Sequence, residues 1–498
     1  MNRPLALLSL LLAFAPPAAS AQPPPAKATT VTLRPASEPR PPLKYRLVPP
    51  RPTLEAGNAA VFYHRALMML IERRNRLAGE EERRASGKPA ARGVSTDEKI
   101  SNWTYRPLAE IPRDEARAAL GQFADSLREV DFGVKRLDCD WGFDHRTEGA
   151  SLLIPEIQEI RSIARLLSLQ ARLAILDGDL DRAFDRVETG LTMARHVARG
   201  PLVIQALVGV AISNEMVACL QALVQAPGAP SLYWALANRP RPFIDMTDAF
   251  EAELDVLADE LPALRDLEPG VWGQDQARRF VDELQGKLVN VMPGPLMIGG
   301  NSLPNQIPAN LRRLDIAAAC AKAYPEARRA LIADGRAEAE VDAMPVVQVA
   351  ALHTYREYRQ AIDDMHKGTH LPYWQSAALP KVAGLDDADA RKANPLWATF
   401  GSLVAAIDPA RLAGLRLDRQ LDALQCVEAI RLDATSQGGK LPGSLEAITS
   451  FPCPLDPATG KPFAYEAAGD SATLNGPIPA GAPDHPSYAI RYALQSAR

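Results

Sequence analysis

The sequence predicts a mainly α-helical protein: a multi-helix domain built around a buried central helix, with a small C-terminal α+β appendage. Three observations predict this fold class. Residues 202–225 are apolar on almost every side, which is typical of a helix covered by protein all round. Other segments carry apolar residues at spacings of three and four, which indicates helices with one buried face. Near the C-terminus, short apolar segments separated by turn residues predict a hairpin.

The composition excludes some classes of function. The 498 residues are 47% hydrophobic and 23% charged, enough for a large core, and the formal net charge is −4. Without a basic excess to neutralise phosphates, we expect no nucleic-acid partner. The HExxH, GxSxG and phosphate-binding glycine-loop signatures are absent from the sequence, so the common zincin, serine-hydrolase and NTPase classes lack their usual support and no cofactor is expected.

Residues 1–21 predict a signal peptide. Arg3 lies in a short basic region, an apolar run covers residues 5–14, and Ala19-Ser20-Ala21 fits the A-x-A rule of signal peptidase. We therefore expect export to the periplasm or the extracellular space, with a mature chain that starts at Gln22. The alternative of an uncleaved anchor stays open, although the apolar run is short for a bilayer span.

Residues 22–53 are rich in proline and predict a linker, because this composition favours extended polyproline II. A helical domain is expected over residues 54–410. It begins with a helix at 58–76, continues through a charged surface loop at 79–99, and reaches a helix with one apolar face at 113–130.

A helical hairpin is expected next, with helices at 156–176 and 180–199 around a turn at 177–179. The first of these is apolar on two faces, so we expect it between its partner and the central helix. The apolar run of the central helix, residues 202–212, is shorter than the ~20 residues of a membrane span and is followed by Asn214 and Glu215. We therefore interpret it as a core helix and expect no membrane span after signal cleavage.

Proline-interrupted helices follow, and the C-terminal unit covers residues 411–498. It combines a helix at 412–435 with strands near 463–465 and 472–474, and residues 488–492 are able to add a third strand. An isolated hairpin is marginally stable, so the strands must lie on the helix. The other predicted segments are helices at 246–264, 276–288, 310–323, 345–366 and 395–406, and a long loop at 292–308.

Five cysteines in an exported chain leave at least one unpaired if the others are bridged within the molecule. Cys219 and Cys320 lie in helical segments and are expected as buried thiols. Cys426 and Cys453 flank the C-terminal unit, where a disulfide between them is possible.

Several motifs resemble known families. The helix start Asn58-Ala59-Ala60-Val61-Phe62-Tyr63, the loop Cys139-Asp140-Trp141-Gly142, Leu441-Pro442 and the element at residues 454–462 together resemble uncharacterised exported helical proteins of planctomycete-type bacteria. The resemblance implies a layout and no known activity. The hairpin, with small residues at Ala171, Gly178, Ala183 and Ala194, resembles a single tetratricopeptide unit, but no second copy is evident and no solenoid is expected.

The C-terminal element is also similar to the globular part of type II secretion pseudopilins, where a helix is followed by a proline-rich loop and a small sheet. The chain lacks the N-terminal methylated assembly helix of pseudopilins, so filament assembly is not implied.

Two polar clusters are candidate sites. Cys139, Asp140, Asp144 and His145 place a thiol, two carboxylates and an imidazole within seven residues, the groups of a nucleophile with its base or of a metal site. The structural alternative is that such loops cap helices and plug cores. Asp363, His366 and His370 would share one face of an unbroken helix and suit a divalent metal, although Gly368-Thr369 is expected to end the helix first.

Two functions of different classes follow. The leading hypothesis is a non-enzymatic cell-envelope protein that binds a protein partner or a ligand through helical-hairpin surfaces. The alternative is a hydrolase that works at the Cys139–His145 loop. A single pocket lined by both this loop and the loop at 292–308, with convergent polar groups, would favour the enzyme, and a Trp141 buried in a core would favour the structural interpretation.

Overall fold

The computed structural model describes residues 28–85, 94–143, 154–253, 256–268, 270–291, 297–298, 301–302, 309–379, 394, 396–397, 400 and 407–496. Among these residues, 62% are helical and 8% are strand, which confirms a mainly α protein with a small C-terminal strand region. The predicted signal peptide and most of the loop at 292–308 lie outside the described residues.

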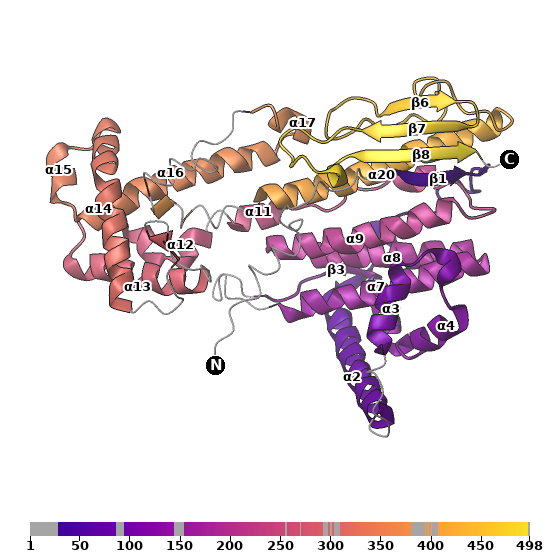
Figure 1. Ribbon diagram of the computed structural model, residues 1–498, viewed down its shortest axis with the longest axis horizontal. Coiled ribbons are helices and arrows are strands. Elements are labelled where there is room, and N and C mark those ends of the chain that lie inside the picture. Colours follow the sequence, from indigo (N-terminus) through magenta and orange to yellow (C-terminus); the bar gives the residue numbers. More distant parts are fainter. Residues whose placement is uncertain are drawn as a thin grey trace.

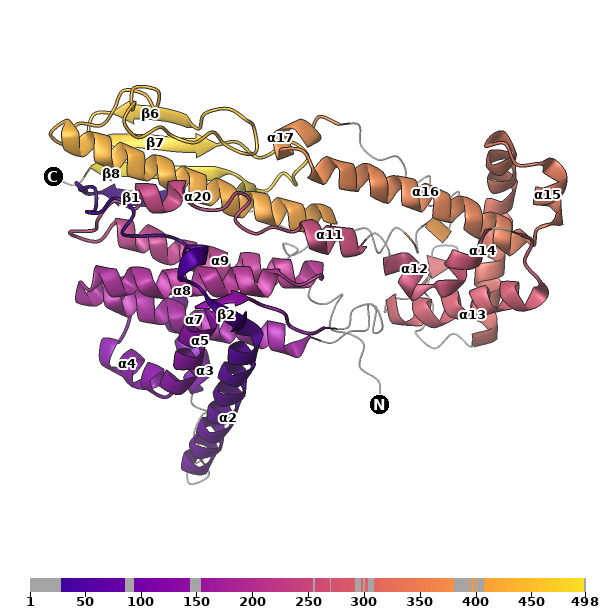
Figure 2. The ribbon, with the colours of Figure 1, turned by 180° about the vertical axis from the view of Figure 1, so that it is seen from behind.

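The main body is a stack of layers (Figure 1). A four-stranded sheet lies on helix α20 (Ile407–Ser436), α20 lies on α9 (Val203–Val224), and α9 lies on the hairpin of α7 (Pro155–Asp177) and α8 (Leu180–Ala198). Figure 2 shows the same layers from behind. The hairpin is covered in turn by the N-terminal helices α2 (Ala59–Ala85), α3 (Thr96–Tyr105), α4 (Arg113–Gly121) and α5 (Ala124–Gly133).

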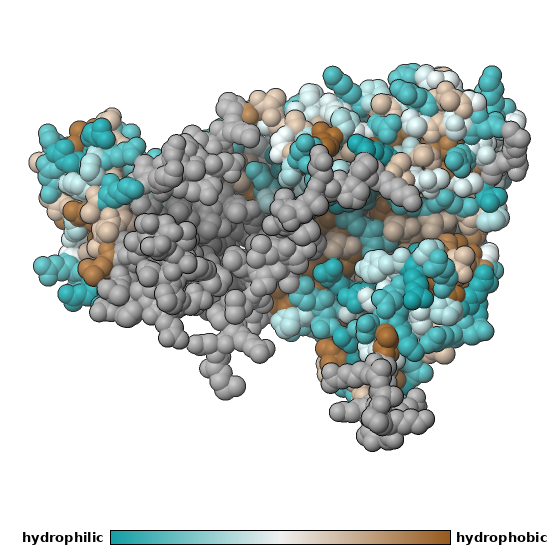
Figure 3. Space-filling model, in the orientation of Figure 1, coloured by the Kyte–Doolittle hydropathy of each residue, from teal (hydrophilic) through white to brown (hydrophobic). Residues whose placement is uncertain are grey.

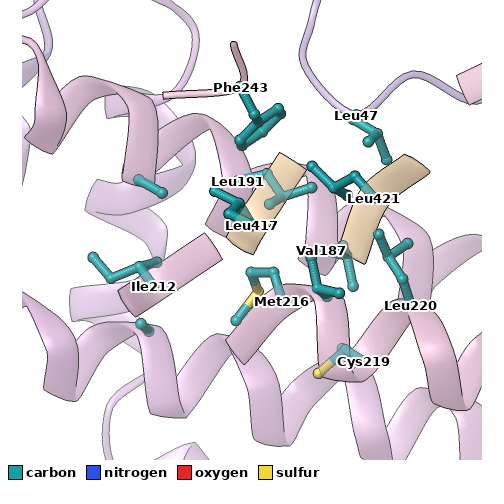
Figure 4. Close-up of a cluster of buried hydrophobic side chains, with 14 of the residues drawn as sticks. Leu47, Val187, Leu191, Ile212, Met216, Cys219, Leu220, Phe243, Leu417 and Leu421 are labelled. Carbon is teal, nitrogen blue, oxygen red and sulfur yellow. The ribbon is translucent and has the colours of Figure 1, made fainter. Parts of the chain in front are cut away.

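Helix α9 is the buried central helix that its sequence predicts. It contacts α7, α8 and α20, and side chains from α8, α9 and α20 meet in one apolar cluster (Figure 4). Gly209 permits this packing, because a Cβ there would lie 2.7 Å from the carbonyl oxygen of Ala194 in α8. Among the described helices, α9 is the one long and apolar enough to cross a bilayer, and 72% of its most apolar window is buried inside the protein. Packing therefore accounts for its composition.

We predict that Gly209→Ala lowers the free energy of unfolding by ~1–3 kcal/mol, the usual cost of overpacking a core. The new methyl group meets a backbone carbonyl, which cannot rotate away as a side chain can. Equilibrium urea unfolding measures the change. Gly79→Ala in α2 is the matched control, since nothing lies within 4 Å of its Cβ position and helical Ala is favoured over Gly by roughly 0.5–1 kcal/mol. Equal stability of both variants would contradict this account of the α8–α9 contact.

The N-terminal segment differs from the spacer that its prolines predict. Thr29–Leu33 forms strand β1, which pairs in parallel with β8 (Ile490–Ser496) at the edge of the sheet. Tyr45 and Leu47 are buried, and the backbone N–H of Ala36 donates to Thr435 Oγ1 of α20 over 3.0 Å. Prolines at residues 35 and 41–42 leave β1 itself uninterrupted, and an edge strand tolerates the proline-rich flank.

The sheet has the order β1-β8-β7-β6, in which β6 (Ala464–Ala468), β7 (Ser471–Gly476) and β8 form an antiparallel meander. Alternate residues of β7 and β8 are buried, among them Leu474, Tyr492 and Leu494, as expected when one sheet face packs and the other meets solvent. Phe463 is buried as expected, whereas Tyr465 is half-buried and its hydroxyl donates to the carbonyl of Pro442. Strand β8 is the third strand that the sequence predicted near residues 488–492.

Buried charges on α20 join distant parts of the chain. Arg419 donates through Nε and Nη2 to both carboxylate oxygens of Asp456, at 2.8 and 2.7 Å, and each side chain is 1% exposed. Arg419 also donates to the carbonyls of Pro477 and Tyr488 in the sheet connections. About three turns further along α20, Arg431 pairs with Glu428 and donates to the carbonyls of Arg34 and Ala229. These contacts hold the sheet, the N-terminal segment and the connection from α9 to α10 (Tyr233–Ala237) on one helix.

The expected division at residue 410 also differs from the structure. Helix α20 and the sheet share one continuous core with α7–α9, so the C-terminal unit is part of the main body. A second core instead gathers residues between Leu257 and Phe400. It contains α12 (Val256–Glu260), α13 (Gln274–Val291), α14 (Ala309–Ala333), α15 (Glu338–Ala343) and most of α16 (Val346–Thr369), which form a lobe at the far end of the molecule (Figure 1).

Smaller differences have local causes. The stripe expected as one helix at 113–130 is split at Gln122–Phe123 into α4 and α5, and Leu120, Phe123 and Leu127 stay buried across the break. Helix α14 runs through Pro325 to Ala333, beyond the end predicted before that proline. All five cysteines are free, so the Cys426–Cys453 disulfide is not formed in this structure.

The remaining described elements are short. The helices α10 (Tyr233–Ala237), α11 (Thr247–Glu253) and α17 (Tyr373–Ser376), the 3₁₀ turns Arg51–Thr53, Leu108–Glu110, Pro262–Asp266 and Pro486–Tyr488, and the strands β2 (Glu55–Asn58), β3 (Arg136–Asp138), β4 (Met297–Ile298) and β5 (Asn301–Ser302) complete the fold.

We predict that Arg419→Met lowers the free energy of unfolding by ~3–5 kcal/mol, because it leaves the buried carboxylate of Asp456 without its counter-charge. Adding Asp456→Asn should recover part of the loss, which thermal or urea unfolding of the three variants measures. Arg76→Met is the control: Arg76 and Glu72 are both 64% exposed, and such pairs contribute less than ~1 kcal/mol. A loss in Arg419→Met no larger than in Arg76→Met would refute the assigned role.

Candidate functional site

The Cys139 loop begins where β3 ends and is held by the start of α2. The side chain of Asn58 pairs with the backbone of Asp140 in both directions: Nδ2 donates to the carbonyl over 2.7 Å, and Oδ1 accepts from the N–H over 2.9 Å. The same Oδ1 accepts from Ala60 at the first turn of α2. Two motifs that carry the family resemblance therefore meet at this point, where Asn58 fixes the helix start and the loop together.

Trp141 fills the core behind the loop. Asp140 Oδ1 accepts from the N–H of Gly142, whose φ of 67° requires a left-handed turn, and this turn directs Trp141 inward. Trp141 is 7% exposed, its ring stacks on Tyr63 with centroids 5.8 Å apart, and its Nε1 donates to the carbonyl of His196. This is the arrangement expected of a structural plug.

A cleft of about 490 Å³ lies on the other side of the loop. Its walls come from the Cys139 loop, the end of α8 and the segment that leads into α11. Arg195 of α8 and Arg199, which caps the end of α8, lie in this cleft with four acidic residues. Both guanidinium groups also donate to backbone carbonyls, of Phe243 and Leu137. The acidic residues of the cleft are Asp138, Asp140, Asp245 and Asp248, all exposed.

The thiol of Cys139 lines this cleft in an environment that keeps it protonated. Burial raises the pKa of Cys139 to about 12, and the neighbouring Arg199 only partly opposes that effect. A cysteine nucleophile reacts as the thiolate, so this environment argues against nucleophilic catalysis. Asp144 and His145, the other proposed members of the cluster, lie outside the described residues.

His196 is the imidazole that the structure places behind the loop, and the sequence reasoning missed it. Its Nδ1 lies 2.7 Å from the hydroxyl of Tyr63, and burial lowers the pKa of His196 to about 3, so the ring is neutral. Arg195 and Arg199 were also missed as site residues, although their i, i+4 spacing at the end of α8 was a readable signal. Asp245 and Asp248 carried no such signal, because only the folding of the chain brings these two residues to the same cleft as Cys139.

The second predicted cluster comes together only in part. Helix α16 ends at Thr369, as expected, and the rings of His366 and His370 pack edge to face with centroids 4.8 Å apart. Asp363 is exposed, and the described residues contain no group of three or more potential ligands placed to hold a metal ion. The histidine pair is thus a ring contact at a helix end, where the helix dipole favours such side chains.

No family model, no curated protein and no solved structure matches this chain. The resemblances to exported helical proteins, to a tetratricopeptide unit and to pseudopilins therefore remain predictions from sequence, and the site must be interpreted from its own geometry.

We predict that iodoacetamide at pH 8 modifies Cys139 at least ~100-fold more slowly in the folded protein than in the urea-unfolded chain, because a pKa raised from 9.0 to about 12 removes most of the thiolate. Mass spectrometry of the peptide that contains Cys139 follows the rate. Equal rates in the folded and unfolded states would show a reactive thiolate and would support the hydrolase alternative.

Proposed function

We propose that this chain is an exported cell-envelope protein that binds a protein partner, without catalysing a reaction, through the cleft beside Cys139. Export rests on the signal-peptide pattern of residues 1–21. The observation that carries the binding function is the composition of the cleft: charged side chains converge there from the end of α8, from the Cys139 loop and from the α11 segment, and all of them except the half-buried Arg195 are exposed.

The balance of charge in the cleft indicates the kind of partner. Four carboxylates face two guanidinium groups, and both guanidinium groups already donate to carbonyls of the protein. The cleft therefore carries an excess of negative charge near solvent, and complementary charge favours a basic segment of a partner. Because these charges are exposed, they contribute more to the association rate and to specificity than to affinity, and binding should weaken as salt screens them.

The buried side of the loop supports binding over catalysis. Trp141 is packed in the core, Cys139 is held as a thiol, and the one hydrogen bond of the His196 ring among the described contacts goes to Tyr63. The alternative function, a hydrolase at the Cys139–His145 loop, is favoured only by the position of Cys139 in the cleft.

The test is affinity capture from envelope extracts with the parent protein and with Asp245→Asn/Asp248→Asn, followed by mass spectrometry. We expect a basic protein that the parent retains at low salt and that the double variant loses at least tenfold. Asparagine preserves the acceptor that Asp245 presents to Thr247, so the change removes charge and keeps the turn.

The matched control is Asp114→Asn/Asp125→Asn, which also removes two exposed carboxylates, on α4 and α5, away from the cleft. This control should retain the partner at the parental level. If both double variants lose the same proteins, or if neither loses any, the cleft is not the binding surface.

A further inference from the structure

A second cavity, of about 260 Å³, lies between helices α3, α7 and α9. It shares no lining residue with the cleft beside Cys139. Figure 3 shows a band of apolar residues on the surface between the sheet layer and helices α3 and α7. Figure 1 shows that α9 lies along the same band. Tyr105, which is 71% exposed, lines the cavity at the end of α3.

The two long walls of the cavity carry opposite chemistry. Helix α7 contributes the guanidinium groups of Arg161 and Arg172, which are hydrogen-bond donors. Helix α9 contributes the carboxyl group of Glu215 and the amide of Asn214. These two residues interrupt the apolar face of the central helix, and the structure places both at this cavity. The lining also contains short apolar side chains, hydroxyl groups and one thiol, namely Ala211, Ile212, Ala218, Thr104, Tyr105, Ser168 and Cys219.

The polar groups of both walls are incompletely satisfied by the protein. Arg172 is 8% exposed; its Nη2 donates to the carbonyl of Arg106, and its Nε has no hydrogen-bond partner in the described part of the chain. Glu215 Oε1 and Asn214 Oδ1 are buried and likewise lack a partner among the described residues. Each such group costs ~1–3 kcal/mol, and native proteins rarely leave three together without a reason.

We propose that this cavity binds a small zwitterion with one carboxylate and one primary ammonium group, of the class of the short aliphatic α-amino acids. The carboxylate of the ligand accepts hydrogen bonds from the guanidinium groups of Arg161 and Arg172, in the bidentate manner that guanidinium favours. The ammonium group donates to the Glu215 carboxylate and the Asn214 amide oxygen. The ligand thereby provides hydrogen-bond partners for the polar groups of both walls, which neither a simple anion nor a simple cation does.

Size and apolar lining restrict the ligand further. The cavity volume of about 260 Å³ is several times the ~30 Å³ that one water occupies in the liquid, so a molecule of several heavy atoms fits. Ala211, Ile212 and Ala218 offer contact to a short aliphatic side chain, and the described lining contains no third carboxylate or amide for a long polar one.

Protonation of Glu215 makes binding depend on pH. Burial raises the pKa of Glu215 to about 7, and this effect exceeds the opposite influence of Arg165, Arg161, Ser168 and Arg172 on α7. Tyr105 on α3 and Cys219 on α9 also face Glu215. Partial desolvation beside the cavity and the charge of Glu215 raise the pKa of Tyr105, and burial raises the pKa of Cys219 to about 11, so both groups stay neutral. The ammonium group needs the carboxylate form, so affinity should fall as the pH falls from 8 to 5 and the carboxylate takes up its proton.

Isothermal titration calorimetry on the full-length protein tests the proposal, with glycine, L-alanine and L-valine as ligands. Acetate and ethylammonium serve as the two half-ligands. We expect at least one amino acid to bind, both half-ligands to bind at least tenfold more weakly, and the affinity to fall at least tenfold between pH 8 and pH 5. Glu215→Gln should reduce the affinity at pH 8 at least tenfold.

Glu188→Gln is the matched control. Burial raises the pKa of the Glu188 carboxyl group to about 7, as it does for Glu215, but Glu188 lies on α8 and lines neither cavity, so this variant should bind as the parent does. Ala218→Trp is a second variant; Ala218 is exposed, so the protein should fold, and the indole should close the cavity and abolish binding.

The proposal is overturned if none of the three amino acids binds to the parent, if acetate binds as tightly as the amino acids, or if Glu215→Gln and Ala218→Trp both bind like the parent. It does not rest on the protein-binding function proposed above, because neither the lining residues nor the variants are shared.

Discussion

The buried charges of α20 are the constraint on which the rest of the main body depends. A guanidinium group taken out of water must be matched by charge and by hydrogen-bond acceptors, or it costs several kcal/mol. Arg419 finds its match in Asp456 and in two carbonyls of the sheet connections, and Arg431 finds it in Glu428 and in carbonyls of residues 34 and 229. Apart from Glu428, which lies on α20 itself, these partners come from other segments of the chain, so those segments must pack on α20 in one arrangement if both arginines are to be satisfied.

This constraint explains why the C-terminal unit is not an independent appendage. Asp456 belongs to the proline-rich element at residues 454–462, which looked like a family signature and turns out to be the acceptor of Arg419. Strand β1 completes the sheet from the other end of the chain, and Leu421 and Leu417 of α20 pack against α8 and α9 (Figure 4). The strands, α20 and the hairpin helices consequently share one core.

The hairpin of α7 and α8 connects the two proposed binding functions. Helix α8 directs Arg195 and Arg199 into the open, mainly acidic cleft, which suits a macromolecular segment. Helix α7 directs Arg161 and Arg172 into the smaller cavity with donors and acceptors on opposite walls, which suits a small molecule. Both sites depend on α9, since α9 supplies one wall of the small cavity and its packing fixes α8.

The fold class was predictable from the sequence because helical periodicity is local. The central helix, the hairpin and the C-terminal strands all follow from spacings within 20 residues or so. The lobe boundary and the pairing of β1 with β8 were not predictable, since each depends on contacts between residues far apart in the chain. Within residues 28–50 the prolines correctly excluded a helix, yet they carried no information about the sheet edge that accepts β1.

The two candidate sites show the same division. The sequence by itself determined that Cys139, Asp140 and Trp141 form an ordered loop and that Asn214 and Glu215 interrupt an apolar helix. Only the tertiary structure decided that Trp141 is a plug, that the Cys139 thiol stays protonated, and that Glu215 faces Arg161 and Arg172 across a cavity. The physical reason is that burial and charge pairing set the chemistry of a side chain, and both arise from neighbours that the folded chain brings together from separate helices.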